Sequence, residues 1–223
     1  IAAVIPFLGL MPFLLSRRRS APESNRLKTS LGESLKAIVS SRSMLALSYL
    51  RLTFSFTNAF FITLFAVYTE ESLLFTASLI AFFFGIKGIT NMLSRIPSGR
   101  LADRVGCRRP LILAFTLLAI TFLIISEARD VYLLALAMVI YGVAHGMRAV
   151  SEWSMLSECA PSEAGSVATA YLSTVFNVGA AFGAVVAGAL SVVLDAPMIF
   201  RLATIIVFSG VFPVGMLNTS KSS

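Results

Sequence analysis

The sequence predicts an all-α membrane protein: a bundle of six transmembrane helices preceded by the end of one more. Of the 223 residues, 57% are hydrophobic and only 13% carry a charge, which is far more apolar than a water-soluble domain requires. The apolar residues form long runs, and a helix needs about 20 of them to cross a bilayer. Thirteen lysines and arginines fall in links expected on one side of the membrane and one in the links on the other side, as expected when basic loops stay in the cytoplasm.

The first 43 residues predict two segments. Residues 1–15 are apolar but too few to cross a bilayer comfortably, so we expect the end of a truncated transmembrane helix. Residues 16–43 contain seven basic residues against Glu23 and Glu33, which predicts a cytoplasmic basic link. Within this link, leucine and isoleucine recur near helical spacing over 27–39, which predicts a short amphipathic helix along the membrane surface.

The remaining chain predicts a six-helix transmembrane domain over 44–217 and a cytoplasmic tail at 218–223. The link 69–72 contains no cation, and Arg129 is the one cation in the link 127–130. Both links are therefore expected on the outer side of the cell membrane. The segment 151–164 is expected to form an inner link. These links separate six expected spans: 44–68, 73–93, 110–125, 131–149, 165–194 and 198–217.

The charged segment 99–109 links the second and third of these spans. Its arginines predict that it lies in the cytoplasm. Gly99 and Gly106 are expected to let the chain turn tightly between helices, because glycine readily adopts positive φ. Asp103 lies among basic residues and is expected to be ionised and paired with them.

The pattern Gly-x-Leu-Ala-Asp-Arg-x-Gly-x-Arg-Arg over 99–109 resembles the cytoplasmic signature loop of the major facilitator superfamily (MFS) of secondary transporters. The segment 160–165 is similar to that family's Pro-x-x-x-Arg-Gly link into a glycine-rich helix. Two positions depart from the family pattern: Ala164 replaces a common arginine, and Cys107 replaces a usual basic residue.

Members of this family have twelve spans in two six-helix halves. The resemblance therefore implies that the chain is the C-terminal half, an MFS half-bundle, and that a six-helix N-terminal half is its missing partner. It further implies transport of a small-molecule substrate across the lipid bilayer by alternating access, with efflux as one direction. The sequence does not distinguish uptake from efflux.

The resemblance also implies a gating role for the signature loop. Asp103 would pair with arginines and hold the two halves closed on the cytoplasmic side. The alternative is a loop that only sets the topology, in which the carboxylate relieves repulsion among the arginines. The residues that carry the gating prediction are Gly99, Asp103, Arg104, Gly106 and Arg108.

A second group of charged residues lies near the inner end of the fifth span. His145, Arg148 and Glu152 are spaced to share one helix face, and Arg148 can pair with Glu152 four residues later. We expect Arg148 and Glu152 to form an inner charge network with Asp103. Alternatively, Arg148 extends to the interface or meets the substrate. His145, the single histidine, either relays protons or hydrogen-bonds within the bundle.

Polar residues inside the expected spans are the candidates for a substrate pathway. Arg51 and Lys87 would each face a wet cavity or extend towards the headgroups. Asn58 and Asn177 lie near the middle of their spans, where they would contact substrate or hydrogen-bond between helices. The pathway candidates are Asn58, Lys87, His145 and Asn177.

Two pairs of glycines four residues apart predict close helix packing. They are Gly142 with Gly146 and Gly179 with Gly183. In a transporter, the same smooth surfaces would let helices slide past one another.

Other classes of function are disfavoured. The sequence contains no nucleophile–base set, metal-ligand spacing or phosphate-binding glycine loop, so we expect no enzyme, cofactor or metal. The net charge of +7 lies mainly in links between apolar runs, so no nucleic-acid partner is expected. Two alternatives stay open: a seven-helix membrane receptor, which has the same number of spans, and a non-transporting fragment that lacks its partner half.

Overall fold

The computed structural model of the chain describes residues 31–160 and 165–215, and the regular structure in these residues is helical. The expected span at 1–15 and most of the basic link lie outside the described residues. In chain order the elements are α2 (Leu31–Ser40), α3 (Arg42–Val67), the π-helical turn η1 (Tyr68–Ser72), α4 (Ala77–Val105), α5 (Arg108–Glu127), α6 (Val131–Cys159), α7 (Gly165–Leu190), α8 (Ala196–Ser209) and α9 (Val211–Val214).

Six membrane-spanning candidates are present among the described residues. They are α3 with η1, the helices α4 to α7, and α8 with α9, each long and apolar enough to cross a bilayer. This confirms the prediction of an all-α membrane protein.

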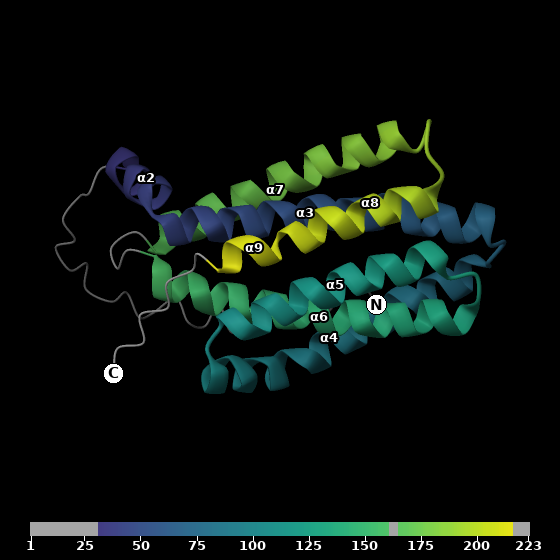
Figure 1. The fold of residues 1–223 in the computed structure, drawn as a ribbon, viewed down its shortest axis with the longest axis horizontal. Helices are drawn as coiled ribbons and strands as arrows, with labels where there is room; N and C mark the ends of the chain where they lie inside the picture. Colours follow the sequence, from purple (N-terminus) through teal and green to yellow (C-terminus); the bar gives the residue numbers. More distant parts are fainter. Residues whose placement is uncertain (1–30, 161–164, 216–223) are drawn as a thin grey trace, which may run out of the picture. The chain divides into compact units, whose positions relative to one another are not determined.

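The helices pack in two groups of three that are joined along one side. α6 packs along α4 and α5, whereas α3 packs along α7 and α8. α5 and α8 contact each other and join the groups, as Figure 1 shows. α3 and α6 therefore lie inside the bundle, and α4 and α7 are the least buried of the six spans.

Side-chain caps define where several helices begin. The hydroxyl of Ser41 accepts a hydrogen bond from the Met44 backbone N–H at the start of α3. The Asp130 carboxylate accepts one from the Leu133 backbone N–H at the start of α6. Such caps satisfy backbone donors that have no partner within the helix.

The turn after α4 is shorter than the sequence indicates. α4 continues as a helix through Gly99 and Asp103 to Val105, so the prediction of a turn at Gly99 is wrong. A Cβ at Gly99 would lie 3.8 Å from the Val150 side chain, because α4 packs along α6 beyond the end of its apolar run. The turn is confined to Gly106, whose φ of 81° ends the helix.

The inner link after α6 is also shorter than expected. α6 continues to Cys159, so the expected link at 151–164 is mostly helical. Residues 161–164, which belong to the second family-like segment, lie outside the described residues. The apolar runs thus mark where helices meet hydrocarbon, not where the helices end.

Aromatic rings fill the centre of the bundle. The Phe61 and Tyr141 rings stack at 4.7 Å between centroids, and Phe122 lies 5.9 Å from Tyr141 and 6.3 Å from Phe200. All four side chains are buried. These contacts join α3, α5, α6 and α8, because large flat rings bury much apolar area and pack edge to face or offset.

The helix α2 precedes the first span. Its Ile38 is fully buried, whereas Lys36 is exposed, as in an amphipathic helix. The predicted helix is confirmed over 31–39, and residues 27–30 lie outside the described residues. Its position at the membrane surface stays a prediction.

The glycine pair of α6 lies directly against α4. A Cβ at Gly142 would be 2.6 Å from the Lys87 carbonyl oxygen, and one at Gly146 would be 2.6 Å from the Asn91 carbonyl oxygen. No side chain fits at these distances, so the two backbones are in contact, as close packing by small residues requires.

The glycine pair of α7 approaches α3 in the same way. A Cβ at Gly179 would lie 3.0 Å from the Leu52 carbonyl oxygen, and one at Gly183 would lie 2.9 Å from the Ala59 Cβ. Each group of three helices therefore has one seam of direct backbone contact.

Candidate functional site

Two stripes of side chains on α3 and α6 face each other across the bundle. Because the helices run antiparallel, residues early in α3 meet residues late in α6. Arg51 is about 14 Å along α3 from its first residue, at ~1.5 Å per residue, so the contact lies well inside the span. With Lys87 of α4, the polar members of these stripes form what we call the polar strip: Arg51, Asn58, Lys87, Tyr141, His145, Arg148 and Glu152.

Glu152 holds two arginines at once. Its Oε1 accepts a hydrogen bond from Arg51 Nη1 at 2.7 Å, and its Oε2 is bound by Arg148 Nη1 of the same helix. The exposed fractions of Arg51, Arg148 and Glu152 are only 8%, 5% and 1%. This triad is a buried group of two positive charges and one negative charge.

Each cation of the strip also lies over aromatic rings. The Arg51 guanidinium is 4.8 Å from the Trp153 ring centroid, and that of Arg148 is 3.7 Å from Phe54. The Lys87 ammonium lies 4.4 Å from Phe61. Ring faces attract cations, most strongly where water is excluded.

Lys87 lies between two aromatic rings, and its expected position facing a wet cavity stays a prediction. Its ammonium lies between the Phe61 ring and the Tyr141 ring, 4.5 Å from the latter, and its side chain is half-buried. The long alkyl chain reaches across from α4 to rings on α3 and α6 instead of to a headgroup.

Asn58 and Tyr141 form a buried hydrogen bond between α3 and α6. The Tyr141 hydroxyl donates to Asn58 Oδ1 at 2.6 Å, and both side chains are buried. Of the two roles considered for Asn58, the structure shows the interhelical hydrogen bond.

Replacing Tyr141 with phenylalanine is expected to destabilise the bundle by about 0.6–2 kcal/mol, the range for such bonds between membrane helices. The change keeps the ring but leaves Asn58 Oδ1 without this donor. Unfolding in detergent by added SDS measures the loss, and a double-mutant cycle with Asn58→Leu isolates the pair. Tyr132→Phe is the control, because Tyr132 is 87% exposed in the same helix, and an equal loss there would contradict the assignment.

His145 lies between the hydrogen bond and the triad. Its ring centroid is 5.0 Å from Phe54 and 6.1 Å from Tyr141, and its Nδ1 is buried without a hydrogen-bond partner. Within residues 31–160 and 165–215, this nitrogen thus lacks the hydrogen bond that was one expectation for His145. Its other expected role, as a proton relay, stays a prediction.

The end of α4 and the turn after it form a separate polar cleft, which we call the inner cleft after the side on which the sequence predicts it to lie. Residues 102–109, with Ser154 and Glu158 of α6, line a volume of about 720 Å³. Asp103, Arg104 and Arg108 are exposed there. Among the described residues Asp103 forms no ion pair, and its expected pairing with arginines and its place in the network of Arg148 and Glu152 stay predictions. It lies two residues before the end of α4, whereas Glu152 binds Arg51 of α3.

Cys107 is buried at the back of this cleft. Its thiol donates to the Ser154 hydroxyl at 3.2 Å, and its exposed fraction is 3%. Burial raises the pKa of the Cys107 thiol, since removal from water disfavours the thiolate.

Maleimide is therefore expected to modify Cys107 more slowly than half-buried Cys159 at neutral pH. The reactive species is the thiolate, so the rate at Cys107 should rise only at a pH above the range of an ordinary thiol. Mass spectrometry of the variants Cys107→Ser and Cys159→Ser measures each site alone. Both should react equally after unfolding in SDS, and equal rates in the folded protein would contradict the buried position.

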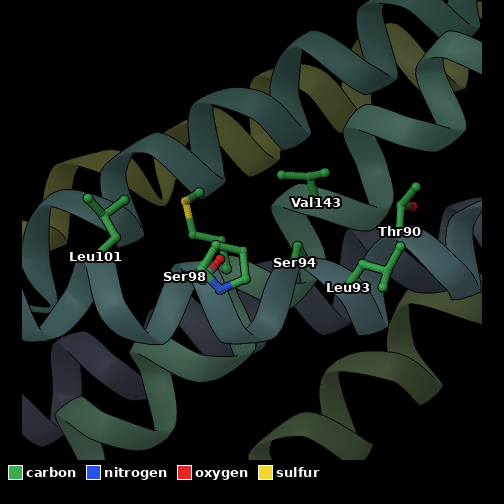
Figure 2. A pocket seen from close by; sticks show the side chains of 8 residues that line it. Thr90, Leu93, Ser94, Ser98, Leu101 and Val143 are labelled. Carbon is green, nitrogen blue, oxygen red and sulfur yellow. The ribbon is translucent and has the colours of Figure 1, made fainter.

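A shallow groove between α4 and α6 is mainly apolar. Figure 2 shows its lining of Thr90, Leu93, Ser94, Ser98 and Leu101 from α4 and Val143 from α6; Pro97 and Met147 complete it, and the volume is about 370 Å³. The Thr90 and Ser94 hydroxyls donate to carbonyls of their own helix. The groove therefore offers a solute mainly apolar contact.

The structure brings together five of the predicted residues, because Arg148 binds Glu152 and three others lie nearby, and it separates the rest. Lys87 and Asn58 share Tyr141 as a neighbour, and His145 and Arg148 share Phe54. Asn177 is exposed on α7. The signature residues lie in the inner cleft.

Sequence reasoning missed that Arg51 binds Glu152, because the two residues are 101 positions apart. A signal was present, since the sequence of α3 contains Arg51 but no acidic residue, so its counter-ion had to come from another element.

Comparison with known proteins identifies the family. The family model described as "Major Facilitator Superfamily" matches residues 1–125 and 51–221. A search of curated proteins finds no match to the chain. Taken with the six apolar helices, the family match makes the chain a multi-pass membrane transporter. The chain belongs to the Major Facilitator Superfamily.

Proposed function

We propose that this chain is the C-terminal half of a secondary transporter and that its polar strip lines the path of a small solute through the membrane. The observation that carries this proposal is the buried triad of Arg51, Arg148 and Glu152 inside otherwise apolar spans. A charge near the centre of a membrane helix costs about 2.5–3.5 kcal/mol on insertion scales and usually marks a functional site.

Stability alone does not account for this triad. Apolar residues that fill the same space are often as stabilising as a buried ion pair, or more so. Retaining three charges between α3 and α6 therefore favours a role in solute binding. The aromatic rings beside them supply apolar contact for the rest of a solute.

Alternating access requires a second bundle that moves against this one. We assign the contact with a six-helix N-terminal half to the exposed apolar faces of α4 and α7, the least buried spans. Large exposed side chains on these faces are Phe82, Ile89, Met92, Ile96, Phe182 and Val185. The exposed Asp103, Arg104 and Arg108 of the inner cleft would then pair with that half when the inner side is closed.

The proposed orientation places the inner cleft in the cytoplasm of a cell membrane. In a chain without native cysteines, a cysteine at Asp103 should react with a membrane-impermeant maleimide only after sealed cells are opened. A cysteine at exposed Ser72 should react in intact cells. Reaction of both from the same side would overturn the arrangement of spans.

Uptake into proteoliposomes tests the proposed function. Thermal-shift screens against sugars, organic ions and hydrophobic drugs select solutes, and the chain is reconstituted alone and with a six-helix N-terminal partner. We expect accumulation only with both halves and its loss in Arg148→Gln. Arg201→Gln is the control, because Arg201 and Glu127 form an exposed pair away from the strip. Absence of accumulation under all conditions would favour the non-transporting fragment, and ligand binding without accumulation would favour the receptor.

A further inference from the structure

The charges of the polar strip do not balance. Arg51, Lys87 and Arg148 are cationic, whereas Glu152 is the one carboxylate that the described part of the strip contains. Glu152 uses one oxygen for each arginine, so two guanidinium groups share a single negative charge. An excess of buried positive charge is costly, because the interior screens it poorly.

Unused hydrogen-bonding atoms lie on the two helices that this carboxylate joins. In the described residues, four buried side-chain nitrogen or oxygen atoms have no hydrogen-bond partner, and all four belong to α3 or α6. They are Arg51 Nε, His145 Nδ1, Arg148 Nε and Ser151 Oγ. Two belong to the arginines of the triad, and a third belongs to Ser151, which precedes Glu152 in α6. Buried polar atoms are rarely left without a partner in folded proteins, so their concentration in these two helices indicates a missing ligand.

We propose that the transported solute is a small organic anion and that its acidic group binds between Arg51 and Arg148 in competition with Glu152. This inference rests on the proposed function. Guanidinium groups bind carboxylate or phosphate through two parallel hydrogen bonds, and each arginine here has a further N–H available at Nε. Ser151, which precedes Glu152 in α6, has a buried hydroxyl that is without a hydrogen-bond partner in the described residues. Glu152 acts as the internal counter-ion that neutralises part of the charge of the two arginines when no solute is bound.

The rings around the site define the rest of the solute. Phe54 lies against Arg148, and Trp153 and Phe176 lie 4.8 and 5.5 Å from the Arg51 guanidinium. Phe54 is buried, but Trp153 is exposed and Phe176 is half-buried. The latter two rings therefore leave apolar surface next to Arg51, which suits a solute with an acidic group on a flat or apolar body.

Tryptophan fluorescence reports on binding directly, since Trp153 is the single tryptophan of the chain and contacts Arg51. The probes are benzoate, benzamide and benzylamine, which share one ring and differ in charge. In purified protein we expect benzoate to change the fluorescence saturably. Benzamide should bind with an affinity at least about tenfold lower, because it cannot form the charge-assisted hydrogen bond, which contributes about that factor to affinity. Benzylamine should not bind. Equal effects of the amide or the amine would overturn the inference.

Variants identify the side chains that bind benzoate. Arg148→Gln should weaken benzoate binding about tenfold or more, and Arg148→Lys should also weaken it because lysine cannot bind with two parallel donors. Glu152→Gln should strengthen benzoate binding, because it removes the competing carboxylate but keeps its shape. Arg201→Gln should leave binding unchanged. Circular dichroism checks that each variant is folded, and unchanged affinity in Glu152→Gln would overturn the role of Glu152.

Transport assays separate this inference from the function on which it rests. Counterflow of benzoate in proteoliposomes that contain both halves, with none of benzylamine, supports both. Transport of the amine in place of benzoate overturns the anion inference and leaves the transporter intact. Benzoate binding without movement of any solute overturns the proposed transport and leaves the anion site.

Discussion

Replacing Glu152 with glutamine is expected to destabilise the protein by about 3–5 kcal/mol, the cost of removing one partner from a buried ion pair. Both arginines would remain between α3 and α6 with exposed fractions of 8% and 5% and without their counter-ion. Glutamine keeps the shape and one acceptor, so the loss reports the charge rather than a cavity. The midpoint of SDS-induced unfolding measures it.

The exposed ion pair at the other end of the bundle is the matched control. Glu127 and Arg201 are joined at 2.6 Å, but both side chains are 57% exposed, and such pairs contribute about 0–1 kcal/mol. Glu127→Gln should therefore have little effect on unfolding. Equal losses in the two variants would show that water reaches Glu152.

A variant with three apolar residues separates stability from function. Arg51→Met, Arg148→Met and Glu152→Leu together remove every charge of the triad and keep its bulk. Stability should recover to near that of the original protein, because no buried charge is left unpaired, whereas benzoate binding and uptake should be lost. Recovery of uptake would contradict a role for these charges in transport.

Replacing Gly146 with valine is expected to destabilise the protein by about 1–3 kcal/mol, as overpacking does in well-packed interiors. The new Cβ would lie 2.6 Å from the Asn91 carbonyl oxygen, so α4 and α6 would have to separate. That separation would also move Lys87 of α4 away from Tyr141 of α6, which are now 4.5 Å apart. SDS-induced unfolding measures the stability, and benzoate titration measures the effect on the site.

Gly88→Val is the control for this change. Gly88 lies in α4, and a Cβ there meets no atom within 4 Å. Both variants place a β-branched residue in a membrane helix, so differences in helix propensity cancel. A similar change in the two variants would show that the α4–α6 contact can adjust to an added side chain.

The positions of the spans were predictable from local sequence, and their ends were not. Hydrocarbon admits only helices that satisfy their own backbone, so each long apolar run had to be a helix. Outside hydrocarbon this constraint disappears, and neighbouring helices decide where a helix stops. Gly99 illustrates the difference: its flexibility suggested a turn, but α4, which packs along α6, continues as a helix through it to Val105.

The candidate site was predictable in part. Helical spacing alone places Arg148 four residues before Glu152, and the pair forms. The same sequence also offered Asp103 as a partner, because it is acidic and lies among arginines. Charge and spacing identify which residues are costly to bury, but they do not identify which helix faces which.

By itself, the sequence determined that this chain crosses a membrane several times as helices and which of its residues are unusual there. Tertiary structure alone decided that Arg51 meets Glu152, that Lys87 lies between Phe61 and Tyr141, and that four buried polar atoms without a hydrogen-bond partner in the described residues all belong to α3 or α6. The physical reason is that these helices are apolar nearly all round, so their sequences do not specify rotation or register. Both are set by packing, here by glycine seams and stacked rings that bring residues 101 positions apart into contact.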